Sequence, residues 1–537
     1  MSERNNHYDA VIVGAGHNGL VCGTYLAKAG LSACVLERRP LIGGACVTEE
    51  LWPGYRVSTA AHVMGLLQPK VILDLELAKF GFEVLPLPPQ FHPLADGRHI
   101  ILWSEQRRFC AELAKFSKKD AAAYPAYDAH LQRLGKIMQR LLWEVPPDPG
   151  SRRIADLRDL LLFAWRFREI GGRFYDLYDL MTMSAYEYLS RWFESDAAKI
   201  ALGYYPGGAA GQSVSIRTPG TAFLLLRSQL RDSDTPAGGS GLARGGMGRI
   251  PEAIVRSGER FGLVVRVNAE VQSIIVRDGR ARGVALASGE EIAGKLIVAN
   301  ADARQTFLSL LDPRSLPDAF VQDIRNFRAT STAFKVHLAV DRLPSYPAFE
   351  ATPHFAYPAQ MRVAPSVGYL EAAYDDMRQG RIARRPYLTV LAPSVVDASL
   401  APQGRHILSL YGGHVPFEPA DGGWENKRDE IFSAVREALS PYAPGFEKGI
   451  LHLQILAPTD FEAIFGLPGG HPHHGEITLD QLFFRRPAPH YANYRSPVPG
   501  LYLCSASTHP GGGVSGVPGH NAARVILQDW KKGRLRS

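Results

Sequence analysis

Cysteine is scarce in this sequence, and its spacing excludes two kinds of site. The 537 residues include five cysteines, with no C-x-x-C pair and no spacing typical of metal ligands. Such patterns mark structural zinc sites and dithiol redox centres. The sequence therefore predicts neither, and a chain without paired cysteines is expected to work in a reduced compartment such as the cytoplasm.

Long apolar runs are also missing. No uncharged apolar stretch reaches the roughly 18 residues that a transmembrane helix needs. Only MSERNNH precedes the first expected strand, which leaves no room for the charged and apolar regions of a secretion signal. We therefore expect a cytoplasmic protein whose contact with a membrane, where it occurs, is peripheral.

Charge of one sign is not concentrated anywhere in the chain. Lys and Arg number 60 against 53 Asp and Glu, yet no block of five or six basic residues occurs. No nucleic-acid-binding signature accompanies the net charge of +7, so no nucleic-acid partner is expected. The hydrophobic content of 46% is enough for a large core, and the length favours two or more domains.

A nucleotide-binding pattern is present in the first forty residues. YDAVIV is typical of a buried parallel strand, and G-x-G-x-x-G follows it at once as Gly14, Gly16 and Gly19. A helix to about Ala29 and a second strand ending at Glu37 complete the unit. The acidic residue lies close to the expected distance, about 20 residues beyond the last glycine.

Each residue of this unit has a physical reason. Gly14 permits the tight turn, Gly16 lets the backbone approach a pyrophosphate, and Gly19 lets the helix pack against the strand. The free N–H groups at the helix start face the phosphate charge. Glu37 accepts hydrogen bonds from ribose hydroxyls and disfavours a 2′-phosphate. The unit predicts a bound dinucleotide, either NAD or FAD.

The segment RRPLIGGACVT, which follows, favours FAD. Arg38 comes next to the acidic residue, and Gly43 and Gly44 follow the second strand. Here the sequence resembles the flavoprotein superfamily of amine oxidases, phytoene desaturases and protoporphyrinogen oxidases, whose glycine pair helps to enclose FAD. The resemblance implies FAD as the cofactor, with Arg38, Gly43 and Gly44 beside it; an ordinary loop is the alternative.

The middle of the chain, from about residue 104 to 192, is expected to be helical. Apolar residues recur there at spacings of three and four, with Arg and Asp between them. Three uses of this apolar stripe stay open: packing in the core, lining an apolar substrate cavity, or binding a membrane surface.

The chain is then expected to return to the first sheet. A helix beginning near Pro251 and the strands within LVVRVNAEVQSIIV and KLIVANA suit this return. The superfamily makes the same return, which implies that the backbone of Val271 contacts the adenine. Gly245, Gly246 and Gly248 do not follow a strand, so no second nucleotide-binding unit is predicted.

Residues 327–456 alternate strand-like runs with Pro-rich loops, which predicts a mainly antiparallel sheet carrying the substrate pocket. Lys335 stands inside an apolar strand. Amine oxidases hold a water against the flavin N5 with a lysine on the corresponding strand, so the resemblance makes Lys335 the first catalytic candidate. A solvated or salt-bridged structural lysine is the alternative. His62 and His509 are the other catalytic candidates.

The stretch GLPGGHPHHGEI gathers His471, His473, His474 and Glu476. The flanking Gly and Pro impose no fixed helical or strand geometry on metal ligands, so no metal site is predicted. A loop reaching over the cofactor or substrate is the favoured interpretation, and a role for the three histidines is left open.

The glycine-rich stretch THPGGGVSGVPGH near the C-terminus lies between an apolar strand-like run and a helix-like run. We expect a further strand of the dinucleotide sheet, a turn at its end and a closing helix. The backbone of Gly512, Gly513, Val514 and Ser515 is expected to approach the cofactor, because side chains there would obstruct it.

Several stretches together resemble one branch of the phytoene-desaturase-like flavoproteins, that of pyridine nucleotide-disulphide oxidoreductase domain-containing protein 2 and its bacterial relatives. They include GGACVTEELWPGYRVSTAAHVMGLLQP and LYLCSASTHPGGGVSGVPGHNAAR, and the match extends over nearly the whole chain. It implies an α/β fold with a Rossmann-type FAD-binding domain and a discontinuous α+β substrate domain. The first comprises 1–85, 238–305 and 495–537, and the second 86–237 and 306–494. Relatives elsewhere are mitochondrial, so that location is expected for a eukaryotic source.

The expected function is that of an FAD-dependent oxidoreductase. It would act on a largely apolar small molecule by hydride transfer, desaturation, saturation or isomerisation. One alternative is an oxygen-dependent amine oxidase. Another is a flavin-bound regulatory or binding protein whose helical region docks a partner or a membrane. The sequence leaves open the substrate, the electron acceptor, the direction of the reaction and the formation of a homo-oligomer.

Overall fold

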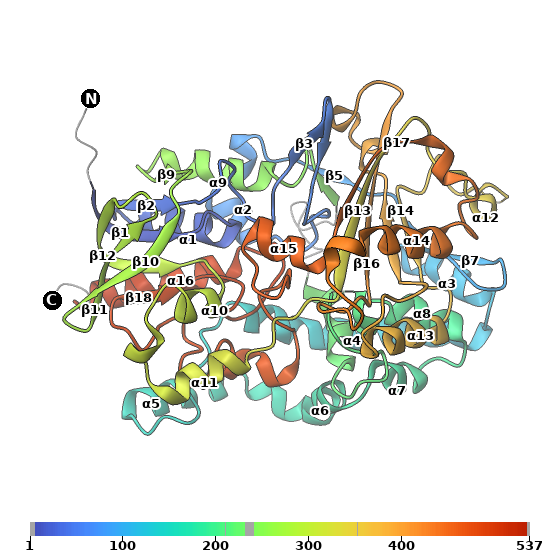
Figure 1. The fold of residues 1–537 in the computed structure, drawn as a ribbon. Helices are drawn as coiled ribbons and strands as arrows, with labels where there is room; N and C mark the ends of the chain where they lie inside the picture. The colour runs from blue at the N-terminus through green and yellow to red at the C-terminus, as the bar shows by residue number, and fades with distance from the viewer. Residues whose placement is uncertain (1–5, 210, 231–240, 352, 534–537) are drawn as a thin grey trace.

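The computed structural model describes residues 6–209, 211–230, 241–351 and 353–533, and it contains two seven-stranded sheets that lie side by side (Figure 1). The first sheet has the order β10-β11-β12-β1-β2-β9, with β18 also paired to β12. Its strands are β1 His7–Val13, β2 Ala33–Leu36, β9 Val264–Arg266, β10 Val271–Arg277, β11 Arg280–Leu286, β12 Glu291–Ala299 and β18 Leu501–Leu503.

The first sheet forms as the sequence predicts, with parallel pairing of the strands next to the glycine turn. β1 pairs in parallel with β2 and with β12, and β18 pairs in parallel with β12. Its two faces are covered by different helices, because alternate residues such as Ile12 and Val13 enter different cores. One face carries α1 His17–Lys28, α9 Arg249–Glu259 and α16 Val517–Lys531, and the other carries α10 Ala303–Leu308 and α11 Asp318–Asn326. The α/β fold with a Rossmann-type first domain is confirmed.

The second sheet is almost entirely antiparallel and has the order β17-β13-β16-β15-β14-β6-β7; only the pair of β14 and β6 is parallel. The strands are β6 Gln90–Pro93, β7 His99–Leu102, β13 Ala333–Val340, β14 Gln360–Val363, β15 Leu388–Leu391, β16 His406–Gly413 and β17 Ile450–Leu456. One face packs on α14 Arg428–Leu439 through residues such as Val336 and Leu410. The opposite face carries polar side chains and is the one that concerns the site.

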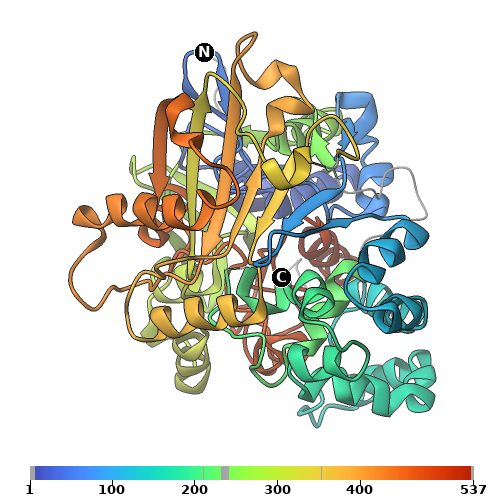
Figure 2. The ribbon, with the colours of Figure 1, turned by 90° about the vertical axis from the view of Figure 1, so that its right-hand side faces the viewer.

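The helical segment forms the lower part of the second domain in Figure 1, and Figure 2 shows it beneath the second sheet. Its core holds Leu131, Leu134, Tyr188, Leu189 and Ile200, all buried. The helices are α3 Gln106–Ala114, α4 Lys118–Leu142, α5 Ile154–Arg166, α6 Phe174–Thr182, α7 Ala185–Ser190 and α8 Asp196–Gly203, joined later in the chain by α13 Val367–Arg378.

The remaining short elements connect these layers. They are β3 Glu49–Trp52 and β4 Tyr55–Val57, which pair with each other, β5 Val84–Pro86 and β8 Gly241–Ala243, which do likewise, and the helices α2 Pro69–Asp74, α12 Pro347–Glu350 and α15 Pro458–Phe465. The helix expected near Pro251 begins two residues earlier, at Arg249.

The packing divides the chain at one place differently from the sequence. The predicted boundary put residues from 306 onward in the substrate domain, and residues 238–240 of the predicted return lie outside the described residues. In the structure Phe307, Phe320 and Ile324 are buried with Val11 against the first sheet. The segment 303–326 therefore packs with the dinucleotide-binding sheet, because its apolar side chains fill the face that α1 leaves uncovered.

Candidate functional site

A cavity of about 1120 Å³ runs between the two sheets. One part of its wall comes from loops at the ends of the first sheet, which contribute residues such as Gly14, Glu37, Gly43 and Val514. The other part comes from the second sheet and the helical segment. The predicted cofactor and substrate regions thus share one continuous space.

The first glycine turn is built as its sequence requires. Gly14 has φ +98°, and its N–H donates to the carbonyl of Leu36 at 2.7 Å. A Cβ on Gly16 would lie 2.7 Å from Asn300 Nδ2, and one on Gly19 would lie 2.4 Å from the Gly14 carbonyl oxygen. α1 begins at His17 without a side-chain cap, so the N–H groups of its first turn face the cavity lined by Gly16 and His17.

The acidic residue at the end of β2 is buried at the cavity wall. Glu37 accepts hydrogen bonds from the backbone N–H groups of Ala15, at 2.9 Å, and Arg39, at 3.0 Å. These bonds fix the carboxylate while each oxygen keeps a second lone pair for a ligand. Val271 lines the cavity beside Glu37 and Arg38, as the adenine contact predicted for it requires. Arg38 is exposed and donates to the carbonyls of α15.

The second glycine pair closes on the first. Gly43 donates its N–H to the carbonyl of Ala15 at 2.8 Å and forms a parallel bridge with Gly16. Gly43 has φ +110°, and a Cβ there would lie 2.3 Å from the carbonyl oxygen of Cys46. Gly44 would place its Cβ 3.4 Å from Gly16 Cα. The two loops therefore touch through backbone alone.

The C-terminal turn supplies the last part of this end of the cavity. Gly513 and Val514 line it, whereas Gly512 and Ser515 are not among the lining residues. Gly512 instead packs on the loop of histidines, since its Cβ would lie 2.3 Å from His473 Cα. Ser515 is buried and accepts the N–H of Gln68 on its carbonyl at 3.2 Å.

This end of the cavity fits a dinucleotide. Two helices, α1 and α16, begin beside it without side-chain caps, the carboxylate of Glu37 stands at its wall, and its glycine loops leave room that Cβ atoms would fill. Gly14, Gly16, Gly43, Gly44 and Gly513 would hold the cofactor through their backbone.

The other end rests on a row of side chains that crosses the second sheet. Arg362 pairs with Thr389, Thr389 with Tyr411, and Tyr411 with Lys335 in the strand registers. Directly paired residues point to the same face, so these four side chains line up on the side away from α14. Arg362, Thr389 and Tyr411 line the cavity.

Lys335, the first catalytic candidate, lies behind the residues that line the cavity. It is fully buried and is not among the lining residues. Its Nζ donates to the carbonyls of Ser58 at 3.1 Å and Ala60 at 2.9 Å, and burial lowers its pKa to about 7. The lysine thus fixes the loop that presents His62, and a catalytic role for it stays a prediction.

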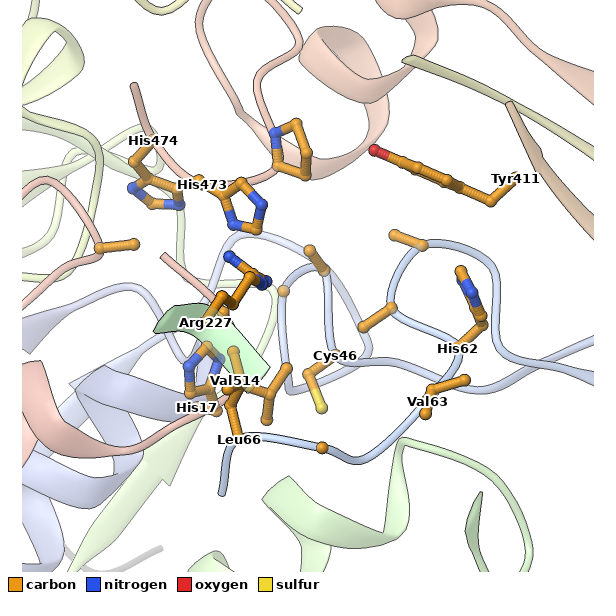
Figure 3. Close-up of a pocket in the computed structure, with 18 of the residues that line it drawn as sticks. His17, Cys46, His62, Val63, Leu66, Arg227, Tyr411, His473, His474 and Val514 are labelled. Atoms are coloured by element: carbon orange, nitrogen blue, oxygen red, sulfur yellow. The ribbon is translucent and has the colours of Figure 1, made fainter. Parts of the chain in front are cut away.

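Of the two histidine candidates, only His62 lines the cavity. His62 lines the cavity, with its ring centroid 5.7 Å from that of Tyr411, and burial holds its pKa well below the usual value (Figure 3). His509 is buried outside the lining, where its Nε2 lies 2.8 Å from the carbonyl of Leu141 at the end of α4. Its position is that of a structural residue, because its polar atom is used in joining the C-terminal turn to the helical segment.

The histidine loop does reach over the cavity. His473 and His474 line it, and Figure 3 shows them on the side of His17 and Arg227, away from Tyr411. Burial lowers the pKa of His474 to about 4 and that of His471 to about 3, so these rings are neutral at pH 7. Among the described residues no group of three or more His, Cys, Asp or Glu side chains is placed to hold a metal ion.

Sequence reasoning missed Arg227, Arg362, Thr389 and Tyr411, all of which line the cavity. A signal existed for three of them: the strands LTVL, QMRV and HILSLYGG each carry polar residues although the sheet is covered on both faces. Arg227 follows an apolar run with no such pattern and is placed only by the tertiary fold.

The chain is similar to known flavoproteins in sequence and in fold. The family model described as flavin containing amine oxidoreductase matches residues 19–527. Pyridine nucleotide-disulfide oxidoreductase domain-containing protein 2 of Rattus norvegicus is 36% identical over 551 residues, covering 98% of this chain and 94% of that protein. Phytoene desaturase (neurosporene-forming) of Cereibacter sphaeroides is 26% identical over 524 residues, covering 95% and 92%. The structure of cyclohexylamine oxidase from Brevibacterium oxydans IH-35A has a TM-score of 0.57 at 15% identity, covering 98% and 99%.

Within the part of the chain that the structure describes, every helix is too short or too polar to cross a bilayer.

Proposed function

The chain belongs to the family of flavin-containing amine oxidoreductases and is an FAD-dependent oxidoreductase, and we propose that its substrate is a largely apolar molecule. The resemblance expected from the sequence is confirmed, and so is FAD as the cofactor. FAD supplies the redox chemistry, by accepting or donating a hydride equivalent at its flavin ring. The protein supplies binding, orientation and a site from which water is excluded.

The observation that supports an apolar substrate is the lining of the cavity on the side of the second domain. There much of the wall is made of aliphatic and aromatic side chains from the end of β7 and from the helical segment: Leu102, Trp103, Tyr124, Tyr127, Leu131, Leu202, Tyr205, Leu224 and Leu225. Pockets that bury apolar ligands have such linings, with few polar groups fixing the orientation. One relative is named as a phytoene desaturase, which agrees with desaturation, saturation or isomerisation of double bonds as the reaction type.

The chain's own residues would act on such a substrate in two ways. His62 and Tyr411 stand on the same side of the cavity, above the loop that Lys335 holds by its carbonyls. The neutral His62 ring offers a proton acceptor there and Tyr411 a hydroxyl donor. A substrate that fills this space displaces its water, which strengthens every polar contact there.

The test is anaerobic mixing of the FAD-loaded protein with a panel of lipids, carotenoids and amines, followed by the flavin absorbance. We expect bleaching by an apolar member of the panel, because the flavin is reduced as the substrate is oxidised. Where the protein saturates double bonds, the substrate is expected to restore the colour of flavin reduced beforehand. Bleaching by amines alone, with formation of hydrogen peroxide when oxygen is admitted, would support an amine oxidase instead. Cyclohexylamine oxidase shares the fold. A flavin that no member reduces would favour the regulatory alternative.

We also propose that α5 and α6 rest on an anionic membrane surface. None of the side chains of α5 is buried, and only Leu180 of α6 is. Ile154 is 86% exposed and Tyr175 is 81% exposed, and the two helices hold further exposed apolar residues: Leu157, Leu161, Leu162, Trp165, Phe174, Tyr178 and Met181. The same stretch carries arginines at 152, 153, 158, 166, 168 and 173 and acidic residues at 156, 159, 169, 176 and 179. This combination is typical of helices that lie in the lipid interface and would bring an apolar substrate to the protein.

A vesicle-binding experiment checks this surface. The wild type is expected to sediment with vesicles of phosphatidylcholine and phosphatidylglycerol, and a variant with Leu161→Ser and Trp165→Ser to bind at least about tenfold more weakly, because two large apolar side chains leave the contact. Leu451→Ser, at a residue 43% exposed on β17, is the matched control and should bind like the wild type. Equal binding by all three proteins, or a dimer of the wild type that the double substitution dissociates, would contradict the membrane assignment.

A further inference from the structure

One cavity-lining side chain carries a charge that nothing in the described chain neutralises. Arg362, on β14, is only 8% exposed and lines the cavity. No Asp or Glu oxygen of the described residues lies within 4.0 Å of its guanidinium, whereas other arginines of this protein, such as Arg428 and Arg495, are paired. A buried cation without a partner is costly, so its retention needs a reason.

The contacts of Arg362 satisfy only part of its guanidinium. Nη1 donates to the carbonyl of Ala201 at 3.3 Å, and the rings of Tyr204 and Tyr205 each have their centroid 5.0 Å from the guanidinium carbon. These contacts orient the group, but Nε is buried with no hydrogen-bond partner. A guanidinium held in place, with donors left over at a cavity wall, is arranged to receive an oxyanion.

Two glutamines beside the arginine add polar atoms at the same place. Gln360 lies two residues before Arg362 on β14, hence on the same face, and it lines the cavity with Gln90. Gln90 Nε2 donates to Gln360 Oε1 at 2.7 Å, so the two amides are fixed against each other beside the guanidinium. Asp128, an acidic residue of the lining, accepts hydrogen bonds from Gln106 and Gln132 instead of pairing with Arg362.

We propose that Arg362 binds a carboxylate of the substrate, so that the substrate is an apolar acid. The inference rests on the proposed function, because it names the polar end of the apolar molecule. Arg362 and Tyr411 are two strands apart in the row, which is about 10 Å at the ordinary spacing of strands. The carboxylate therefore sits at one end, and the apolar part of the molecule extends over Thr389 and Tyr411 toward the cofactor.

The experiment measures binding to the FAD-loaded protein at pH 8 through changes in the flavin spectrum, with dodecanoate, dodecan-1-ol and dodecylamine as probes. The wild type is expected to bind dodecanoate at least about tenfold more tightly than the alcohol, and the amine most weakly, since charge-assisted hydrogen bonds are the strong ones. Arg362→Met is expected to lose the preference for the acid and keep the affinity for the alcohol. Arg342→Met, at an exposed arginine paired with Asp341, is the matched control and should behave like the wild type.

The possible outcomes distinguish a failure of the carboxylate site at Arg362 from a failure of the proposed apolar substrate. Equal binding of acid and alcohol by the wild type overturns the role of Arg362 but leaves an apolar substrate standing. Failure of all three probes, with FAD retained, counts against the apolar substrate itself. Should Arg362→Met not fold, Arg362→Lys serves, and the preference of the wild type for the acid decides the matter without any variant.

Discussion

Replacing Gly43 by alanine is expected to yield a protein that no longer retains FAD. The new Cβ would lie 2.3 Å from the carbonyl oxygen of Cys46 and 2.8 Å from Pro251 Cγ, at a backbone φ of +110°. A clash with backbone cannot be relieved by a rotamer, so the turn must move, and with it the bridge that holds Gly16 against Gly43. We expect the dissociation constant for FAD to rise at least about 100-fold, equivalent to about 2.8 kcal/mol.

The measurement is titration of the apoprotein with FAD, followed by flavin fluorescence. Gly30→Ala is the matched control, since Gly30 also has positive φ, +91°, lies in the same domain just beyond α1, and has no atom within 4 Å of the added Cβ. It should cost only about 1–2 kcal/mol of stability and leave FAD affinity near that of the wild type. A Gly43→Ala protein that folds and stays yellow would show that the touching glycine loops do not hold the cofactor.

Substitution of Arg486 by methionine is expected to be the most destabilising change among the arginines of the site. Arg486 is fully buried and has no carboxylate partner among the described residues; it donates instead to main-chain carbonyls. Among these, Ala506 accepts at 2.8 Å, His473 at 2.9 Å and Glu476 at 3.0 Å. The guanidinium thus ties the histidine loop to the C-terminal turn. Burial lowers its pKa to about 10, so it stays charged at pH 7.

Removing it leaves several buried carbonyls unpaired, each costing about 1–3 kcal/mol. We expect a loss of at least about 3 kcal/mol, seen as a lower urea midpoint together with earlier release of FAD, because both joined loops line the cavity. The neighbouring Arg485 is exposed, and Arg485→Met is the matched control, expected to unfold within about 0.5 kcal/mol of the wild type. Similar midpoints for the two variants would mean that the fork of hydrogen bonds contributes little.

The dinucleotide-binding half of the molecule was predictable because its signals are local. The strand, glycine turn, helix and acidic residue occur within one short segment, and each glycine has a backbone reason that needs no knowledge of the rest of the fold. The same holds for the C-terminal glycines, where an apolar strand and an amphipathic helix on either side excluded a loose tail. Even there, packing made distinctions that spacing did not. Gly513 and Val514 face the cavity, while Gly512 contacts His473.

The substrate side was not predictable in the same way. The resemblance to amine oxidases predicts Lys335, which stands inside an apolar strand, as catalytic, yet the fold places its amine against the loop at 58–60, and Tyr411, its neighbour across the sheet, is the lining residue. His509, another predicted catalytic candidate, lies outside the lining. Each residue is set by partners far away in sequence, which no local pattern contains.

The sequence by itself determined the cofactor fold, the family and the kind of chemistry, since these depend on short-range backbone geometry and on patterns that repeat with the strand and helix periods. The tertiary structure alone decided which polar side chains come to lie at and behind the wall of the cavity. Arg362, Thr389, Tyr411 and Lys335 come from four separate strands, and only their pairing in one sheet puts them in a row. Strand register is a long-range property, and a shift of one residue would have turned each of them to the opposite face.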